Sequence, residues 1–504
     1  MTLFADIDDF WDDFLAWLPF LLGLTEIAIV VLFIGWALMT KTDSTSAMAW
    51  CLLIFFLPFV GAALFYLLGY QHVTRPLRRK RRHKQRYRAQ APRTPSDADV
   101  PPLEHEDQAI QEVADLHREM HLVAARAGAY PLTLGNHVEM YHEGQPAFEA
   151  MLGAIQTAKH HIHWLTFIFQ YDEIGRTVLE MLTRKAREGV KVRLLYDAMG
   201  SRHLSRQRLQ EFRAAGGMAH PFLPVDPLHR RIQVNLRNHR KILVVDGQVG
   251  FVGGLNVGDE YLGKVERFGF WRDTHLRLEG PAVGDLQRVF AEDWDFACTE
   301  QLCQPDDAVA NTLYYQPKAV DGPYPAQIIE SGPDRDVKPI REVYFAAILK
   351  ARKRVWIASP YFVPDNGLRD ALRLAGQLGI DVRFLGQHHP DKWLAQYAAR
   401  FYWGQVLPAG VKIYQYTKGM MHSKVVMVDG IWASVGSANL DNRSLHLNFE
   451  VNCLLYSRAA VAELEAAFER DLADAIRLDR HVYSKRPFPG RLMENACRLF
   501  SPVL

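Results

Sequence analysis

The chain carries one sequence layout twice, and this repeat constrains the fold more than any other feature. The first copy has a β-branched and aromatic run at 160–170, a helical pattern that stops at Gly189, and an alternating run at 190–197. The second copy has the same succession at 354–361, 368–378 and 380–385, with Gly379 as the stop. Strand–helix–strand units indicate α/β domains. We therefore predict two similar α/β domains that meet with pseudo-two-fold symmetry and bring equivalent residues to one shared site.

A His-x-Lys-x4-Asp motif stands at the same place in each copy. The six candidate catalytic residues are His239, Lys241 and Asp246 in the first motif and His422, Lys424 and Asp429 in the second. Residues two apart in an extended strand project from one face. Each His and Lys is therefore expected to lie side by side on a buried strand, formed with the apolar runs 242–245 and 425–428. The two motif aspartates are expected to support the motif more than to transfer protons.

A turn of small residues that ends in asparagine follows each motif. The first turn is 253–256 and ends at Asn256, and the second is 436–439 and ends at Asn439, with Ser437 where the first has Gly254. A side-chain amide can donate to a phosphate oxygen, so both asparagines and Ser437 are candidate supporting residues. A single motif would be weak evidence, whereas two with matching turns in a duplicated region indicate a functional site.

Two apolar stretches open the chain, at 14–39 and 48–70. The first holds one ionisable residue, Glu26, and the second holds none. About 20 apolar residues suffice to cross a bilayer as a helix. We predict an N-terminal transmembrane helical hairpin, although Glu26 and Pro58 leave a re-entrant or surface-lying first segment as the alternative. The acidic first residues do not fit a cleaved signal peptide.

A basic cluster follows the second stretch, with nine Lys/Arg and no acid at 75–88. The whole chain has a net charge of +2, so the remainder is mildly acidic. Because a nucleic-acid binder is basic across its domain surface, we expect no nucleic acid as a partner. The positive-inside rule places this segment in the cytoplasm, where its charge favours anionic membrane lipids. A solvated linker is the alternative.

The five cysteines show no paired spacing that would indicate disulfides or a zinc site. We expect no metal and no cofactor. The predicted segments are a membrane anchor with two transmembrane helices at 1–72, a basic and Pro/Ala-rich linker at 73–103, a first domain at 104–310, and a second at 311–504 that ends in a basic, apolar tail.

On these motifs the chain resembles the phospholipase D superfamily, and within it the bacterial cardiolipin synthase family. The resemblance covers nearly the whole sequence, including the apolar pair and the segments 238–261, 271–283, 330–336, 360–365 and 439–450. The segment 386–391 departs from the expected pattern, and it bears on the choice of headgroup or acceptor rather than on phosphoryl chemistry.

The resemblance implies two tandem phospholipase D-like domains around a metal-independent site. By analogy, His239 is the nucleophile that forms a phosphohistidine, and His422 is the general acid and base; the symmetry of the repeat leaves this order open. Lys241 and Lys424 supply fixed positive charge for the phosphodiester where other enzymes use Mg²⁺.

The resemblance also implies that two carboxylates, Asp273 and Glu450, orient the catalytic imidazoles. Structural ion pairing is the alternative role for both.

The reaction implied is transfer of a phosphatidyl group between two phosphatidylglycerol molecules, which gives cardiolipin and glycerol at the bacterial inner membrane with the catalytic domains in the cytoplasm. The alternatives are a hydrolase, a transphosphatidylase with another alcohol, a nuclease, which the apolar hairpin disfavours, and an inactive lipid-binding scaffold, which the intact motifs disfavour. The sequence makes no prediction of oligomeric state.

Overall fold

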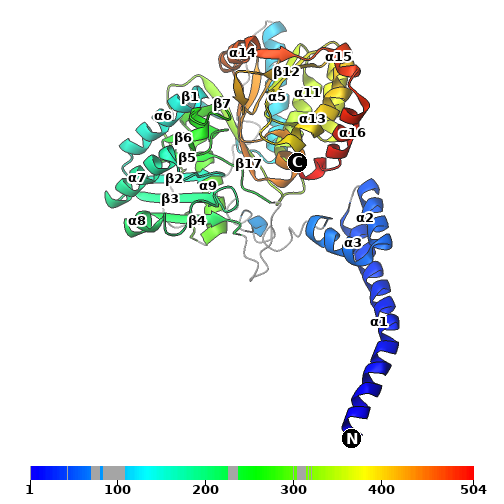
Figure 1. The fold of residues 1–504 in the computed structure, drawn as a ribbon. Helices are drawn as coiled ribbons and strands as arrows, with labels where there is room; N and C mark the ends of the chain where they lie inside the picture. Colours follow the sequence, from blue (N-terminus) through cyan, green and yellow to red (C-terminus); the bar gives the residue numbers. More distant parts are fainter. Residues whose placement is uncertain are drawn as a thin grey trace. The chain divides into compact units, whose positions relative to one another are not determined.

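The computed structural model describes residues 2–41, 44–69, 80–82, 84, 108–224, 236–298, 300–302, 314–315, 317–318 and 320–504. The chain forms two compact units, Met1–Arg75 and Pro76–Leu504. Figure 1 shows the first as helices and the second as mixed α/β structure.

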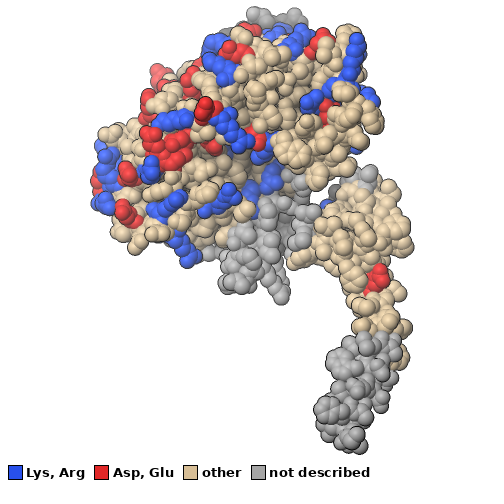
Figure 2. Space-filling view, in the orientation of Figure 1, with Lys and Arg blue, Asp and Glu red and all other residues tan. Residues whose placement is uncertain are grey.

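The first unit is helical and apolar. It contains α1 (Thr2–Thr40), α2 (Ser44–Phe56), α3 (Pro58–Leu64) and the π-helical turn η1 (Phe65–Gly69). Among the described residues, one helical segment, Trp17–Thr40, is long and apolar enough to cross a membrane. Figure 2 shows the described surface of this unit as almost entirely uncharged.

The second apolar stretch does not form the single spanning helix that we predicted. Leu57 lies before Pro58 and has φ −134° and ψ 69°, outside the helical region, because a residue before proline is pushed out of the α conformation. The break leaves α2 with 13 residues, which is about 20 Å at 1.5 Å per residue, less than the roughly 30 Å of a bilayer core. The segment still packs against α1, since Ala37, Ile54 and Phe65 are buried together.

The second unit contains α5 and the first half of the repeat. In chain order these elements are α5 (Gln108–Ala127), β1 (Thr133–Glu143), α6 (Gly144–Thr157), β2 (His161–Thr166), α7 (Glu173–Arg187), β3 (Lys191–Asp197), α8 (Gln210–Ala214), β4 (Met218–Phe222), β5 (Ile242–Val245), β6 (Val249–Gly253), η3 (Asp259–Leu262), β7 (Phe270–Glu279) and α9 (Ala282–Cys298).

The second half repeats this order and adds a C-terminal extension. Its elements are β8 (Tyr324–Ser331), α11 (Pro339–Lys350), β9 (Arg354–Ala358), β10 (Phe362–Val363), α12 (Asn366–Gln377), β11 (Asp381–Gln387), α13 (Trp393–Val406), η4 (Leu407–Ala409), β12 (Lys412–Tyr416), β13 (Gly419–Met421), β14 (Val425–Val428), β15 (Trp432–Gly436), β16 (Leu440–Asp441), η5 (Arg443–Leu447), β17 (Glu450–Leu455), α14 (Arg458–Ala473), β18 (Ala475–Arg477), α15 (Arg480–Ser484), α16 (Phe488–Arg498) and η6 (Ser501–Val503).

Equivalent helices of the two halves start and stop for the same local reasons. The side chain of Asp172 accepts a hydrogen bond from Gly175 at the start of α7, and Asp365 does the same for Leu368 at the start of α12. Each helix is followed by a glycine with positive φ, Gly189 after α7 and a second after α12. Both helices therefore lie where the repeated pattern predicted them.

The two halves share one sheet. Among the described residues its order is β18-β12-β11-β9-β14-β15-β17-β8 in the second half, continued by β1-β7-β6-β5-β2-β3-β4 in the first, with β13 paired to β7. The antiparallel pair of β1 and β8 stands at the centre, and the strands on either side follow in equivalent order. This arrangement confirms the predicted pseudo-two-fold symmetry, which Figure 1 shows as two similar lobes.

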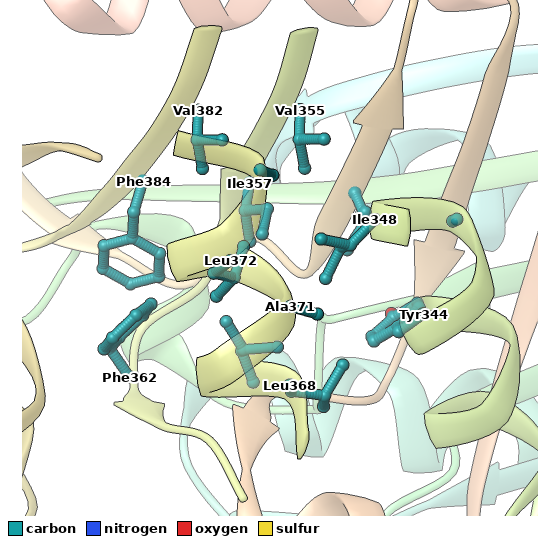
Figure 3. Close-up of a cluster of buried hydrophobic side chains, with 14 of the residues drawn as sticks. Tyr344, Ile348, Val355, Ile357, Phe362, Leu368, Ala371, Leu372, Val382 and Phe384 are labelled. Atoms are coloured by element: carbon teal, nitrogen blue, oxygen red, sulfur yellow. The ribbon is translucent and has the colours of Figure 1, made fainter. Parts of the chain in front are cut away.

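Each half has its own hydrophobic core. In the second, α11 and α12 cover β9 and β11, and Figure 3 shows Ile348 and Leu372 beside Ile357. Helix α5 falls in the predicted first domain by sequence, yet its Leu116 and Met120 are buried in this second core. The predicted boundary at 310/311 lies outside the described residues and stays a prediction.

The basic cluster contributes buried residues to the second unit. Lys80 and Lys84 are almost fully buried, where Lys80 pairs with Asp293, and Lys84 pairs with Glu330 and lies 3.3 Å from Glu292. We predicted that the whole cluster contacts lipid or is solvated, and this prediction is wrong for Lys80 and Lys84. Their neighbours Arg81 and Arg82 are exposed, and the other five basic residues, Arg75, Arg78, Arg79, Arg86 and Arg88, lie outside the described residues.

Candidate active site

The two motif histidines lie just before β5 and β14, in extended segments that the opposite half of the molecule holds. The backbone N–H of His239 donates to the carbonyl of Phe449 at 2.9 Å, and that of His422 donates to Arg272 at 2.7 Å. We predicted that His and Lys would sit on the strands themselves, and the apolar runs that follow do form β5 and β14 as predicted. The histidine and lysine at the start of each motif lie outside the regular strands, because the backbone of each histidine is hydrogen-bonded to the other repeat.

The carboxylates that hold the imidazoles are exchanged between the halves. His239 Nδ1 lies 3.1 Å from Glu450 Oε2, and His422 Nδ1 lies 2.7 Å from Asp273 Oδ2. Both carboxylates are fully buried. A carboxylate on Nδ1 fixes the ring orientation and leaves Nε2 free for chemistry. Each half therefore supplies the orienting group for the histidine of the other.

The difference between Gly254 and Ser437 follows from these carboxylates. Ser437 Oγ donates to Glu450 Oε2 at 2.5 Å and accepts from the N–H of Val451. At the equivalent position of the first half, a β-carbon on Gly254 would overlap Asp273 Oδ1. Ser437 therefore braces the orienting carboxylate, while Gly254 makes room for the other one.

The two motif lysines are buried and close to loss of charge. Burial lowers the pKa of Lys241 to about 7, against the attraction of Glu450, and it lowers the pKa of Lys424 to about 8, against the attraction of Asp273. Each ammonium donates to the carbonyl of the histidine two residues before it. Each lysine therefore needs a nearby anion to keep its positive charge in this buried site.

The two histidine–carboxylate pairs are electrostatically different. Burial lowers the pKa of His239 well below its ordinary value, and Lys241 adds to this effect. Burial also raises the pKa of Glu450 to about 7. In the other pair, burial and Lys424 lower the pKa of His422 to about 4.

The carboxylate of this second pair stays ionised. Burial raises the pKa of Asp273, but Lys424 and His422 outweigh it and bring the pKa down to about 2. His422 is therefore the imidazole with a fully charged partner.

The motif aspartates hold the loops that precede β2 and β9. Asp246 accepts from the backbone N–H groups of residues 159–161, and Asp429 accepts from those of residues 352–354, at 2.7–2.9 Å. Both have φ near +55°, which places the carboxylate over these amides. This geometry fits the supporting role.

The asparagines of the two turns differ in the hydrogen bonds that they make with the protein. Asn256 Nδ2 donates to the hydroxyl of Tyr261 at 2.8 Å, and its oxygen accepts from Ile168. One of its two amide hydrogens is therefore engaged inside the protein, and a second N–H remains as a donor. Asn439 is buried in the second half, and its side-chain oxygen has no hydrogen-bond partner in the described structure.

A buried ion network behind the first motif was missed by the sequence analysis. Arg240, between the motif His and Lys, points away from the site and donates to Asp293 at 2.8 Å and to Glu330 at 2.5 Å. The same two acids bind Lys80 and Lys84. Because successive side chains of an extended segment alternate, the sequence predicts that Arg240 faces away from His239 and Lys241. Its partners could not be predicted, since they come from segments far apart in the chain.

Aromatic rings flank both imidazoles, with Phe167 5.0 Å from His239 and Trp271 5.0 Å from His422 between ring centroids. These rings keep water from the sides of the histidines. Within the described ranges, no group of three or more His, Cys, Asp or Glu is arranged to hold a metal ion.

The chain matches the family described as cardiolipin synthase, phospholipase D-like domain, over residues 151–294 and 344–472. Residues 27–69 match the phospholipase D-nuclease N-terminal family. The chain belongs to the cardiolipin synthase family of phospholipase D-like proteins. One matched segment falls in each half of the sheet, which confirms the predicted tandem phospholipase D-like domains.

Named relatives of this family match most of the chain. A cardiolipin synthase of Geobacillus kaustophilus is 40% identical over 511 residues, covering 100% of this chain and 97% of the relative. Cardiolipin synthase 2 of Bacillus cereus is 44% identical over 384 residues, covering 76% and 73%. A phosphatidylserine synthase structure from Haemophilus influenzae shares the fold, with a TM-score of 0.57 and 17% identity over 76% of this chain and 100% of that one.

Proposed function

We propose that this chain is a cardiolipin synthase that transfers a phosphatidyl group from one phosphatidylglycerol to a hydroxyl of a second, with release of glycerol. One observation carries the proposal: two histidines with exchanged carboxylate partners share a buried site with two lysines. The relatives named cardiolipin synthase at 40–44% identity support this choice among phosphodiester reactions.

In the first half-reaction, Nε2 of His239 attacks the phosphorus of the donor lipid. The bond to the glycerol headgroup oxygen breaks, and His422 gives that oxygen its proton, so glycerol leaves and a phosphohistidine remains. Lys241 and Lys424 balance the phosphoryl oxygens as charge moves onto them.

In the second half-reaction, neutral His422 takes the proton from a hydroxyl of the second phosphatidylglycerol. The alkoxide oxygen attacks phosphorus, the phosphorus–nitrogen bond to His239 breaks, and cardiolipin forms. The proton that left with glycerol is thereby replaced on His422 by the proton of the acceptor hydroxyl, and the enzyme is regenerated.

The electrostatics support this order of roles. A nucleophile must be neutral, and burial with Lys241 holds the pKa of His239 far below neutrality. A general acid must carry a proton, and ionised Asp273 favours the charged form of His422. A phosphodiester bound between the lysines would raise the low pKa of His422 in the empty site.

Purified full-length protein in mixed micelles with headgroup-labelled phosphatidylglycerol tests the reaction. We expect cardiolipin and free labelled glycerol in equal amounts by mass spectrometry. Phosphatidic acid without cardiolipin would assign a hydrolase, a mixed product with added alcohol and no cardiolipin would assign another acceptor, and no turnover would favour a lipid-binding scaffold.

Trapping of the phosphoenzyme tests the roles. His422→Ala should still form the adduct with a lipid whose leaving group needs no proton, and His239→Ala should not. The reverse pattern would exchange the two roles.

We further propose that α1 and the broken helix α2–α3–η1 cross the inner membrane as a hairpin with the catalytic unit in the cytoplasm. The basic cluster after residue 75 supports this orientation. In right-side-out vesicles, Ser44→Cys should react with an impermeant maleimide and Leu378→Cys should react only after permeabilisation. Protection of Ser44→Cys would indicate a single crossing, and reaction of Leu378→Cys would indicate the opposite orientation.

A further inference from the structure

Helix α16 has its polarity reversed relative to a helix of a soluble domain. It buries the acid Glu494, which is 1% exposed, and leaves Phe488 67% and Leu492 59% exposed. Leu499, at the C-terminal cap, is 73% exposed. Residues separated by four and seven positions lie on one helical face, so Phe488, Leu492 and Leu499 form a single stripe, here called the C-terminal apolar face.

Ion pairs fix this orientation. Glu494 accepts from Arg400 of α13 at 3.0 Å and from Arg486 at 3.0 Å. Because the pairs lie on the side of α16 that packs against α13, the helix cannot turn its apolar stripe inward without breaking them. These ion pairs therefore keep the apolar stripe on the exposed side of α16.

The surroundings of the C-terminal apolar face are cationic. The segment 480–504 holds five Lys/Arg and a single acid, Glu494, which is buried and paired. Arg491 and Arg498 are exposed on the same helix beside the apolar stripe. Next to it, a groove of about 370 Å³ opens between α13 and α16, lined in part by Phe401 and Phe488.

An apolar stripe with basic flanks matches the interface of an anionic membrane, where acyl chains and phosphate groups lie side by side. A cytosolic protein partner would have to supply both an apolar groove and excess negative charge. The lipid leaflet supplies both, and a chain with a segment that can cross a membrane is already held beside it.

We infer that the C-terminal apolar face docks onto an anionic phospholipid leaflet, with Phe488, Leu492 and Leu499 at the level of the upper acyl chains and Arg491 and Arg498 on the lipid phosphates. Helices of this kind sit about 5–10 Å into the boundary between headgroups and chains. The face is a second membrane contact besides the N-terminal unit.

The test reads the depth of a probe and needs no turnover, so its outcome is independent of the reaction proposed above. The full chain, in vesicles of phosphatidylglycerol and phosphatidylcholine, carries an environment-sensitive fluorophore on Leu492→Cys. The matched control is Leu378→Cys, an apolar residue after α12 that is 72% exposed. Labelling of the unsubstituted protein gives the background from its own cysteines.

We expect brominated acyl chains to quench the probe at 492 and aqueous iodide not to reach it, with the opposite result at 378. Equal access of iodide to both probes would overturn the inference. Protection at 492 without quenching by brominated chains, lost when protein is diluted in lipid, would instead show that a second copy covers the face, and would also overturn it.

The charge requirement has its own comparison. Arg491→Gln/Arg498→Gln should shift the phosphatidylglycerol fraction needed for quenching at 492 to a higher value. The control pair Arg184→Gln/Arg187→Gln, exposed on α7, should leave it unchanged. Equal effects of the two pairs would remove the arginines from the docking surface.

Discussion

At the residue scale, the space around the buried carboxylates determines how the imidazoles are held. Asp273 lies against the α-carbon of Gly254, and Glu450 is braced by Ser437 Oγ. The two halves therefore use different solutions at one symmetric position.

We expect Gly254→Ala to displace Asp273 and to lower kcat by about 10²-fold, because small displacements in a catalytic arrangement cost that much. The measurement is kcat with phosphatidylglycerol, beside thermal unfolding. Gly153→Ala, on the exposed side of α6 with no neighbour near its α-carbon, is the control. An unchanged kcat would show that Asp273 does not orient His422.

The lysine pKa values predict the alkaline limb of the pH profile. Lys241 and Lys424 must be protonated to balance phosphate, and their pKa values of about 7 and about 8 lie near neutrality. Thus kcat/KM, which reports the free enzyme, should fall as pH rises from about 7 to about 9. Arginine keeps its charge throughout, so the residual activity of Lys424→Arg should fall less steeply; an identical limb would contradict the assignment.

Several site residues could be predicted from the sequence because spacing determines them. The motif histidines and lysines share a site as expected, and the apolar runs form β5 and β14, although the histidines and lysines lie just before these strands. Spacing could not show which imidazole receives Asp273 or Glu450, because that depends on how the halves meet. The phosphate contact of Asn256 stays a prediction, and its bond to Tyr261 could not be foreseen because it depends on the fold of the turn.

At the element scale, the short helical turn around Lys80 is part of the catalytic unit. Lys80, Lys84 and Arg240 together neutralise Asp293 and Glu330 behind the first motif. The sequence could not reveal this, because a run of bases looks alike whether solvated or buried, and the acidic partners are more than 200 residues away.

Lys80→Met/Lys84→Met should lower the free energy of unfolding by about 3–5 kcal/mol for each pair broken, since it leaves buried acids unpaired. It should also lower kcat, because Arg240 adjoins His239. Arg81→Met/Arg82→Met removes equal charge from the same turn but at exposed positions, and should cost at most about 1 kcal/mol. Chemical denaturation of both variants in detergent gives the comparison, and equal losses would contradict burial of the two lysines.

The break at Pro58 shows a second limit at this scale. Composition favours a continuous span, but Pro58 pushes Leu57 out of the helical conformation, so the helix breaks there.

At the scale of the whole molecule, each half depends on the other for its chemistry. The crossed pairs predict that Asp273→Asn resembles loss of His422 and that Glu450→Gln resembles loss of His239. With a nitrophenyl leaving group, which needs no proton, Asp273→Asn should form the phosphoenzyme at nearly the wild-type rate, while Glu450→Gln should remain slow. Rapid-quench measurement of the adduct decides, and the opposite pattern would make His422 the nucleophile and His239 the general acid.

The tandem fold and its symmetry were predictable because the repeat is explicit in the sequence. The placement of α5 in the second core was not, because the residues that it packs against come from elements far along the chain, such as α11.

The crossed arrangement also has a consequence for assembly. A chain with one repeat would hold a histidine without its carboxylate, and it would work only when two copies met, at a rate set by their concentration in the membrane. Joining the halves in one polypeptide makes that encounter intramolecular, so the site is complete at any dilution. It also frees the two halves to differ, as they do at Gly254 and Ser437, because neither has to pair with itself.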